Sequence, residues 1–261
     1  MKRIAIGIEY DGRPFCGWQS QASGCGIQDA LQTAIGAIAG ESVTVNAAGR
    51  TDQGVHATNQ VGHFETASTR PLSAWVRGAN AQLPDAIAIR WALEVPDEFH
   101  ARFSARRRMY HYLLLNRFER PALLAGRVGW CHRPLDLDAM RRGAALLVGE
   151  HDFSSFRSAQ CQAKSPVKGM DRVAIDADGA MFVFTFRANA FLHHMVRNII
   201  GALVMVGGGS HEPEWIGELL ALRNRAHAAP TFMPDGLYLS GIEYDPRFGL
   251  PTTEASHPWK S

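Results

Sequence analysis

Apolar and polar residues alternate along the chain with two periods, and these periods predict its elements. Lys2 to Tyr10 (KRIAIGIEY) alternates as a strand does. Ile27, Leu31 and Ile35 stand at helical spacing within residues 26–39, which predicts an amphipathic helix. The same reasoning predicts strands at 43–47, 59–65 and 87–95 and a helix at 72–82. This order of strand, helix, strand, strand, helix, strand is typical of the ferredoxin-like plan.

The second half of the sequence repeats this alternation of strands and helices. We predict strands at 109–116, 173–176, 181–187 and 236–244, and helices at 137–148, 190–206 and 213–222. The sequence therefore predicts an α+β fold of two related ferredoxin-like lobes, whose antiparallel sheets join into a central sheet flanked by helices. The expected domains are 1–104 and 105–245, followed by a loose tail at 246–261.

Composition narrows the class of protein. Hydrophobic residues make up 46% and charged residues 20% of the 261 positions, which is ordinary for a water-soluble globular chain. No apolar run approaches the ~20 residues of a membrane helix, and Glu9 and Asp11 interrupt the N-terminal apolar stretch too early for a secretory signal. The cysteines are widely spaced, so we expect neither a disulfide framework nor a zinc knuckle, and a reducing cytoplasm is the expected location: Cys16, Cys25, Cys131 and Cys161.

Positive charge is concentrated in one segment. The net charge is only +2, yet residues 99–133 contain eight arginines and a single acid, Glu119. A local excess of this kind favours an anionic partner such as a phosphate backbone. The alternative is a solvated arginine face whose acidic partners lie elsewhere in the fold.

The stretch AGRTDQGVHA at residues 48–57 lies between two predicted strands and allows three interpretations. Asp52 and the glycines can simply form an Asx-turn. Asp52 can instead bind a metal ion together with His56 and His63. The third interpretation makes Asp52, which is ionised at neutral pH, a nucleophile or general base. The loop alone does not decide between these interpretations.

Two further segments combine an apolar pattern with unusual polar residues. Along the strand at 109–116, Tyr110 and Tyr112 share a face, and each ring can stack on a nucleobase or pack in the core. On the helix at 190–206, one face is apolar and the other carries His193, His194, Arg197, Asn198 and Gly201. Adjacent helical histidines point about 100° apart, so we do not expect them to bind one metal ion together.

Six motifs follow one another over nearly the whole chain. They are PFCGWQ at 14–19, GRTDQGVHA at 49–57, the HARFSARRRMYHY stretch at 100–112, GEHDFSSFR at 149–157, FLHHMVRNIIGAL at 191–203 and GLYLSGIEYD at 236–245. In this order they resemble the tRNA pseudouridine synthase A family. Gln53 stands where alanine is common in the family, and Lys168 where arginine is common. Neither departure changes the aspartate.

The resemblance implies an activity and a set of site residues. It implies isomerisation of uridine to pseudouridine at positions 38, 39 and 40 of the tRNA anticodon stem-loop, in a cleft between the lobes. Asp52 would be the catalytic nucleophile, acting after the base has been flipped out of its stack. Arg50 would hold the space around the evicted nucleotide, Tyr110 would be the active-site tyrosine and Arg197 would pair with Asp52. The isomerisation requires no redox change or group donor, so we expect no cofactor and no metal.

The resemblance and the charge pattern also predict partners. tRNA is the expected substrate, and a homodimer is the expected assembly because family members contact one tRNA with both subunits. We expect phosphate contacts from the basic segment and from the GEHDFSSFR motif. The candidates are Arg102, Arg106, Arg107, Arg108 and Arg157.

Overall fold

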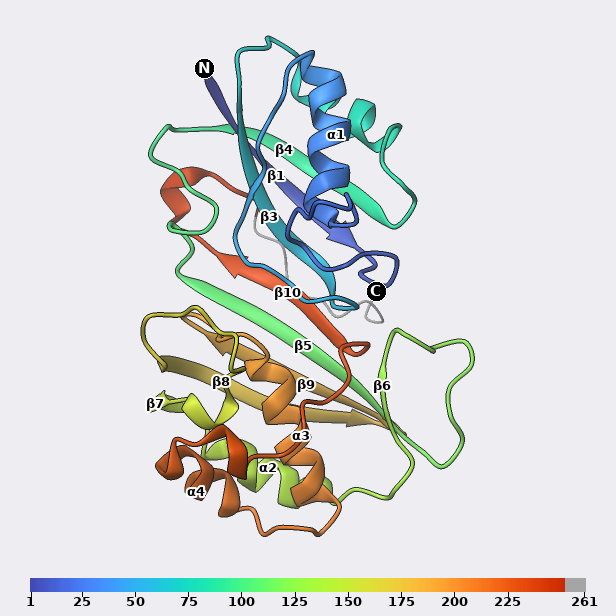
Figure 1. Cartoon of the computed structure of the whole chain (residues 1–261), viewed down its shortest axis with the longest axis vertical. Helices are drawn as coiled ribbons and strands as arrows, with labels where there is room; N and C mark the ends of the chain where they lie inside the picture. Colours follow the sequence, from blue (N-terminus) through green and yellow to red (C-terminus); the bar gives the residue numbers. More distant parts are fainter. Residues whose placement is uncertain (252–261) are drawn as a thin grey trace. The chain divides into compact units, whose positions relative to one another are not determined.

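The chain divides into two units, which the computed structural model describes over residues 1–251 (Figure 1). The first unit contains Met1–Arg107 and the chain from Tyr238 onward, and the second contains Arg108–Leu237. The observed boundary after residue 107 lies close to the expected one after 104. The last strand, which we expected in the second lobe, belongs to the first unit, because it pairs with a strand there.

The first unit has the strand and helix order of the ferredoxin-like plan. Its antiparallel strands lie in the order β4-β1-β3, β2 pairs with β3, and β10 adds to β3 in parallel. Its elements are β1 (Lys2–Tyr10), α1 (Ile27–Ala39), β2 (Asn46–Ala47), β3 (His56–Thr66), the π-helical turn η1 (Ala74–Gly78), β4 (Ile87–Val95), β10 (Leu237–Glu243) and the short helix η4 (Pro246–Phe248). The predicted elements of this half are therefore present, but β2 is shorter than expected, β3 begins at His56 instead of 59, and a π-helical turn forms the middle of the helix expected at 72–82.

Both faces of β1 are buried in the first unit. Ile4, Ile6 and Ile8 alternate along β1 and are buried, as are Ile27, Leu31 and Ile35 of α1, the helix that covers one face of this sheet (Figure 1). On the opposite face, Ala5 belongs to a cluster of buried residues that covers the other side of the sheet. The members of this cluster are Ala5, Ala48, Val61, Val95, Phe99, Ala101 and Phe248.

The segment after β10 is not a loose tail over its described part. η4 begins at Pro246, and Phe248 is buried against Phe99 with ring centroids 5.2 Å apart. The expected tail at 246–261 is therefore wrong for residues 246–248, because an aromatic side chain there completes the core. Residues 252–261 lie outside the described part of the chain.

The second unit combines a run of sheet strands with three longer helices. The sheet runs β5-β9-β8-β7 with antiparallel neighbours, and β6 pairs in parallel with the end of β5. Its elements are β5 (Arg107–Asn116), β6 (Gly129–Cys131), α2 (Leu137–Ala145), β7 (Gly149–Asp152), η2 (Ser154–Phe156), β8 (Val167–Asp178), β9 (Met181–Ala188), α3 (Met195–Gly207), α4 (Trp215–Leu222) and η3 (Arg225–His227). β8 and β9 form a hairpin that turns at Gly179-Ala180, between the paired residues Asp178 and Met181.

Close approaches of glycines fix how α3 packs in this unit. A Cβ atom at Gly201 would lie 2.4 Å from the carbonyl oxygen of Pro230, and one at Gly207 would meet Met140 of α2. The segment after η3 and helix α2 therefore pack directly against α3. This packing explains why a glycine interrupts the helix despite its low helix propensity.

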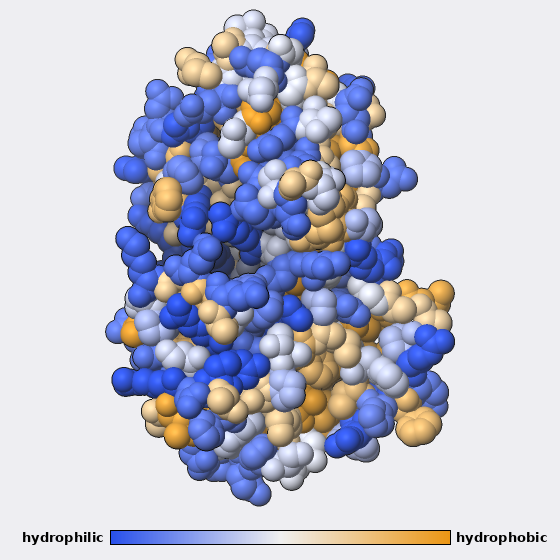
Figure 2. Space-filling model, viewed as in Figure 1, coloured by the Kyte–Doolittle hydropathy of each residue, from blue (hydrophilic) through white to orange (hydrophobic). Residues whose placement is uncertain are grey.

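The α+β class is confirmed in each unit, with sheets covered by helices. Each sheet is mixed because one parallel strand joins the antiparallel set. Among the described residues, no helix is long and apolar enough to span a membrane. The face drawn in Figure 2 intersperses hydrophilic residues with smaller hydrophobic areas, as is usual for protein surfaces.

Candidate active site

Residues 48–55, the aspartate loop, connect β2 to β3 and carry Asp52. The loop begins with Ala48, whose N–H donates to Val61 on β3 (2.8 Å), and it turns where Val55 donates to the carbonyl of Asp52 (3.1 Å). Gly54 takes a left-handed conformation (φ 78°) that completes the turn. Gln53 is exposed at the tip, so a larger residue than alanine is accommodated there without any loss of packing.

The loop that follows β1 supports the aspartate loop by close backbone contact. A Cβ atom at Gly12 would lie 2.0 Å from the carbonyl of Val55, and one at Gly17 would lie 2.9 Å from that of Thr51. The N–H of Trp18 donates to the same Thr51 carbonyl (2.9 Å). Two of the sequence motifs, PFCGWQ and GRTDQGVHA, therefore form one structural unit.

Buried polar side chains anchor the aspartate loop from the interior of the first unit. The hydroxyl groups of Tyr10 and Thr51 share a hydrogen bond of 2.7 Å. Gln60 on β3 donates through Nε2 to the carbonyl of Gly49 (2.7 Å) and to Tyr10 (3.4 Å). Its Oε1 atom is buried without a hydrogen-bond partner. Sequence analysis did not single out these residues, although a glutamine within a buried strand was an available signal.

His56 at the end of the loop is a buried structural residue. Its Nδ1 atom accepts the N–H of Gly12 (3.2 Å), and its ring stacks on Tyr238 of β10 at 4.7 Å. Beside it, burial opposes ionisation of Asp11, but hydrogen bonds from Arg13 outweigh this effect and lower the pKa of Asp11. His56 thus fixes the junction between the loop and β3.

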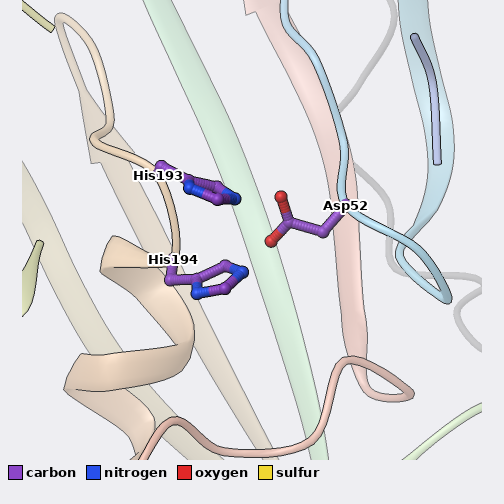
Figure 3. A group of neighbouring side chains, drawn as sticks. All are labelled: Asp52, His193 and His194. Carbon is purple, nitrogen blue, oxygen red and sulfur yellow. The ribbon is translucent and has the colours of Figure 1, made fainter. Parts of the chain in front are cut away.

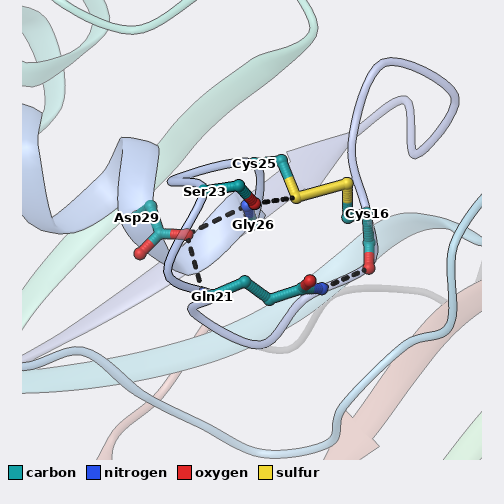
Figure 4. The surroundings of a disulfide bond; sticks show 6 residues. All are labelled: Cys16, Gln21, Ser23, Cys25, Gly26 and Asp29. Atoms are coloured by element: carbon teal, nitrogen blue, oxygen red, sulfur yellow. Dashed lines mark hydrogen bonds between the residues drawn. A yellow bond between two sulfur atoms is a disulfide. The ribbon is translucent and has the colours of Figure 1, made fainter.

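A disulfide joins Cys16 and Cys25 within the supporting loop (Figure 4). Cys16 also donates its N–H to the carbonyl of Cys25 (3.0 Å), and Gln21 donates to the carbonyl of Cys16 (3.1 Å). The wide spacing, from which we expected no disulfide framework, did not predict this pair, because a turn at Gly24 (φ 70°) reverses the chain and brings the two cysteines together. The other two cysteines, Cys131 and Cys161, are free.

The structure separates the residues of the alternative metal set. His56 and His63 lie seven residues apart on β3, which corresponds to about 23 Å along a strand. His63 is buried, its Nδ1 atom accepts the N–H of Ala101 (3.2 Å), and burial together with the neighbouring His100 and Arg3 lowers its pKa to about 4. A metal site formed by Asp52, His56 and His63 is therefore excluded by the geometry.

The two tyrosines of β5 differ in their surroundings. Tyr112 is fully buried and donates to the carbonyl of Met233 (2.9 Å), and burial raises the pKa of its hydroxyl well above the ordinary value. Of the two roles that the sequence left open for Tyr112, its full burial shows packing in the core. Tyr110 is also largely covered, with its ring 4.9 Å from that of Phe191 in an edge-to-face contact. Stacking of a base on Tyr110 stays a prediction.

Residues 189–194, the histidine turn, lead into α3 and are not helical. α3 begins at Met195 and not near Ala190, and His194 takes a left-handed conformation (φ 63°). The rings of His193 and His194 consequently lie side by side, with centroids 4.0 Å apart. The expected separation of about 100° between them is wrong because it assumed a helix. Figure 3 draws both histidines on this turn and Asp52 on the aspartate loop.

Hydrogen bonds to neighbouring segments hold the first turn of α3. Nε of Arg197 donates to the carbonyl of Phe232 (2.8 Å). Asn198 is fully buried, donates to Phe156 (2.8 Å) and accepts from Thr231 (2.7 Å) and Arg225 (3.2 Å). Arg197 is thereby held within the second unit, and its predicted pairing with Asp52 stays a prediction.

The remaining predicted residues lie in varied surroundings. Arg50 is exposed on the aspartate loop. Arg102 lies over the exposed ring of Phe103, 5.6 Å from its centroid. Arg106 is paired with Asp245 at 2.5 Å, and Arg157 donates to the carbonyl of Cys161 (2.7 Å). The predicted phosphate contacts of these arginines, and of Arg107 and Arg108, stay predictions.

Comparison with known proteins assigns the chain to a family. A family model described as tRNA pseudouridine synthase matches residues 6–104 and 144–245. The tRNA pseudouridine synthase A of Dechloromonas aromatica is 59% identical over 95% of each chain, and that of Thiobacillus denitrificans is 58% identical over 99% of each chain. A crystal structure of a Cbf5-Nop10-Gar1 complex matches with a TM-score of 0.37 and 13% identity over 77% of this chain and 45% of that one, a level that carries no argument. The chain therefore belongs to the tRNA pseudouridine synthase family and is an isomerase that converts uridine to pseudouridine in tRNA.

Proposed function

We propose that this enzyme isomerises the uridines at positions 38, 39 and 40 of the tRNA anticodon stem-loop, with Asp52 as its nucleophile. The observation that carries the proposal is the aspartate loop itself. Its backbone is fixed from two sides, by the loop after β1 and by buried polar side chains, while Asp52 stays partly exposed. A preorganised carboxylate of this kind suits attack on an electron-poor carbon.

The reaction exchanges two bonds within one nucleotide. The glycosidic bond between C1′ and N1 breaks, and a bond between C1′ and C5 forms. N1 gains a proton, and the proton of C5 is lost to water, so no oxidant, reductant or group donor enters the balance. Before this exchange the uridine leaves its stack, which costs a few kcal/mol. We propose that the chain does this without cofactor or metal.

We propose supporting roles for three further residues. Arg50 would hold the space around the evicted nucleotide, because it is exposed on the aspartate loop two residues before Asp52. Tyr110 offers an aromatic ring at the start of β5, and a ring in contact with a base contributes about 1–3 kcal/mol of stacking. Arg197 supplies a cation that would favour the ionised form of Asp52.

We further propose that the enzyme acts in the cytoplasm as a homodimer. The location follows from its tRNA substrate. The dimer is supported by the size of that substrate relative to a chain of 28.7 kDa. Light scattering at micromolar concentration measures the assembly directly, and a mass of one chain would contradict the dimer.

The test uses three tRNA transcripts, each with tritium at C5 of a single uridine at position 38, 39 or 40. Label released into water counts isomerisation events. Asp52→Asn keeps the shape of the side chain and removes its charge, so we expect a loss of ~10³-fold or more in rate. Asp85→Asn changes an exposed carboxylate and serves as the matched control, with wild-type rate expected.

Binding and metal dependence are measured in the same experiment. The affinity of Asp52→Asn for tRNA should stay within about threefold of wild type, because phosphate contacts dominate binding. Wild-type release should continue in EDTA. Release by Asp52→Asn at the wild-type rate would overturn Asp52 as the nucleophile, and release from none of the three transcripts would overturn the assigned positions.

A further inference from the structure

The interior contacts of the aspartate loop converge on the residue beside the proposed nucleophile. Thr51 is buried, whereas Asp52 next to it is partly exposed. Thr51 and Asp52 are joined by one planar peptide bond, so the two residues do not turn independently of each other. The contacts that fix the Thr51 side chain therefore also constrain the direction in which the Asp52 side chain points.

The side chain of Thr51 is fixed by Tyr10 across a hydrogen bond of 2.7 Å. Tyr10 belongs to β1, the strand that pairs with both β3 and β4, so its backbone is held on both sides. Its ring also lies 6.0 Å from that of Trp18, whose N–H binds the carbonyl of Thr51. Thr51 is thus held through its hydroxyl group and through its backbone.

Gln60 connects this contact to the start of the loop. The Nε2 atom of its side-chain amide donates hydrogen bonds to both the carbonyl of Gly49 (2.7 Å) and the hydroxyl of Tyr10 (3.4 Å). The opposite amide orientation would bring Oε1 against the Gly49 carbonyl, and two acceptors would then face each other. The orientation is therefore determined by the loop, at the cost of leaving Oε1 buried without a partner.

An unpartnered buried acceptor is unfavourable for stability and calls for a reason. Leucine or methionine would fill the same space in β3 without that penalty. What glutamine adds is the pair of hydrogen bonds to the loop and to Tyr10. The position is thus suited to orienting the aspartate loop and poorly suited to stabilising the core.

We propose that Tyr10, Thr51 and Gln60 form a buried positioning network that aims the Asp52 carboxylate at the reacting nucleotide. The proposal rests on the proposed role of Asp52. None of the three residues needs to touch RNA, because all are buried. They act through the loop, so their removal should slow the chemical step and leave tRNA binding and stability largely unchanged.

Single-turnover rates with saturating tritiated tRNA test this network together with Kd and Tm. Tyr10→Phe removes one hydroxyl, and we expect a rate about 10- to 100-fold lower with Kd within twofold of wild type. Tyr244→Phe is the matched control, because it removes another tyrosine hydroxyl of the first unit, which donates to Ala101 at 2.6 Å. It should change Tm as little as Tyr10→Phe does and leave the rate unchanged.

Substitutions of Thr51 distinguish positioning from simple packing. Thr51→Ser keeps the hydroxyl group and should retain most of the rate, whereas Thr51→Val should resemble Tyr10→Phe. The double variant Tyr10→Phe/Thr51→Val should be no slower than either single variant, because both remove the same contact. Multiplying effects would contradict a shared contact between these two side chains.

Asp52→Asn measured alongside separates this inference from the proposed function. If Asp52→Asn is inactive while Tyr10→Phe and Thr51→Val turn over at the wild-type rate, the network is overturned and the nucleophile stands. If Asp52→Asn retains the wild-type rate, the proposed function itself fails. A rate loss in Tyr10→Phe that Tyr244→Phe shares would show a general loss of stability and would also overturn the network.

Discussion

The aspartate loop and the histidine turn expose polar side chains by opposite means. The loop turns through glycines, and neighbouring segments hold it: Gly12 lies against the Val55 carbonyl with no room for a Cβ, and Gln60 donates to the Gly49 carbonyl. The turn places the constraint in its own backbone, with a non-glycine residue, His194, in the left-handed region. Strain of about 1–3 kcal/mol persists in a turn of this kind only when the surroundings enforce it.

The difference shows which substitutions each region tolerates. The loop depends on residues outside it, such as Tyr10 and Gln60, that can be changed without altering its own sequence. The turn depends on the anchor that follows it, Asn198, whose hydrogen bonds hold the first turn of α3. Loss of that anchor should therefore affect the fold, whereas loss of a loop contact should affect the direction of one side chain.

The largest expected contrast is between Asn198→Leu and Gln60→Leu. Asn198 makes three hydrogen bonds from a fully buried position, and removing it leaves buried partners unsatisfied, at a cost of about 3 kcal/mol of unfolding free energy. Gln60→Leu removes two bonds but also an unpartnered acceptor, so we expect a loss of ~1 kcal/mol or less. Urea denaturation measures both, and a larger loss for Gln60→Leu would reverse the comparison.

Acid should destabilise the first unit through His63, on the strand that follows the loop. Its pKa is lowered to about 4 in the fold from 6.5, so the unfolded chain binds the proton more readily. The stability that this neutral histidine contributes is complete above pH 6.5 and is lost as the pH falls toward 4. His100, whose pKa is also lowered by burial, acts in the same direction.

We expect the unfolding free energy to fall by about 2–3 kcal/mol between pH 6.5 and 4 from His63. His63→Gln keeps an acceptor for the N–H of Ala101 and should flatten this part of the pH profile. Hydrogen exchange, corrected for its intrinsic pH dependence, locates the effect. Protection should decrease in β3 before it decreases in α3, and equal decreases in both would contradict the assignment.

Reduction of the Cys16–Cys25 disulfide should lower the stability of the first unit, which contains the aspartate loop, and leave the histidine turn of the second unit unaffected. Opening a loop of this length releases chain entropy worth ~2–3 kcal/mol of unfolding free energy in the simplest treatment. Unfolding with and without dithiothreitol measures the change, and Cys16→Ser should remove the difference. Cys161, which lies 3.5 Å from the N–H of His193, is free, so Cys161→Ser should keep the response to reductant.

The smallest expected effect is stabilisation by His194→Gly. Glycine adopts the left-handed conformation without steric cost, so relief of strain should raise the unfolding free energy by about 1 kcal/mol. Arg223→Gly at the end of α4 is the control, because Arg223 has a similar φ of 49°. Destabilisation by His194→Gly together with stabilisation by Arg223→Gly would mean that the contact with His193 outweighs the strain.

The sequence predicted the elements and the position of the aspartate, because both follow from local patterns. β4 was predicted residue for residue, since its apolar run ends at clear turn signals. The GRTD motif is likewise local, so its loop could be placed between two strands without knowing the fold. The interior contacts to Tyr10 and Gln60 could not be predicted, because they depend on the strand register.

Three errors have a common physical cause. The start of α3, the pairing of Cys16 with Cys25 and the packing of Phe248 all depend on a chain reversal or a distant contact. The apolar periodicity predicted a helix that includes His194, because no local sequence signal indicates that this histidine adopts a left-handed backbone conformation. The cysteine spacing did not predict the disulfide for a similar reason, because the turn at Gly24 brings Cys16 and Cys25 together.

The parallel pairing of β10 with β3 determines when the first unit can complete its folding during synthesis. Tyr238 and Leu239 pair with His56 and Ala57, so about 180 residues of chain separate the partners. On the ribosome, the first unit must therefore wait for nearly the whole second unit to be synthesised before its sheet gains that strand and His56 its stacking partner. Maturation of the aspartate loop is thereby coupled to synthesis of β10, and a product that stops before β10 would carry the motif without this strand beside it.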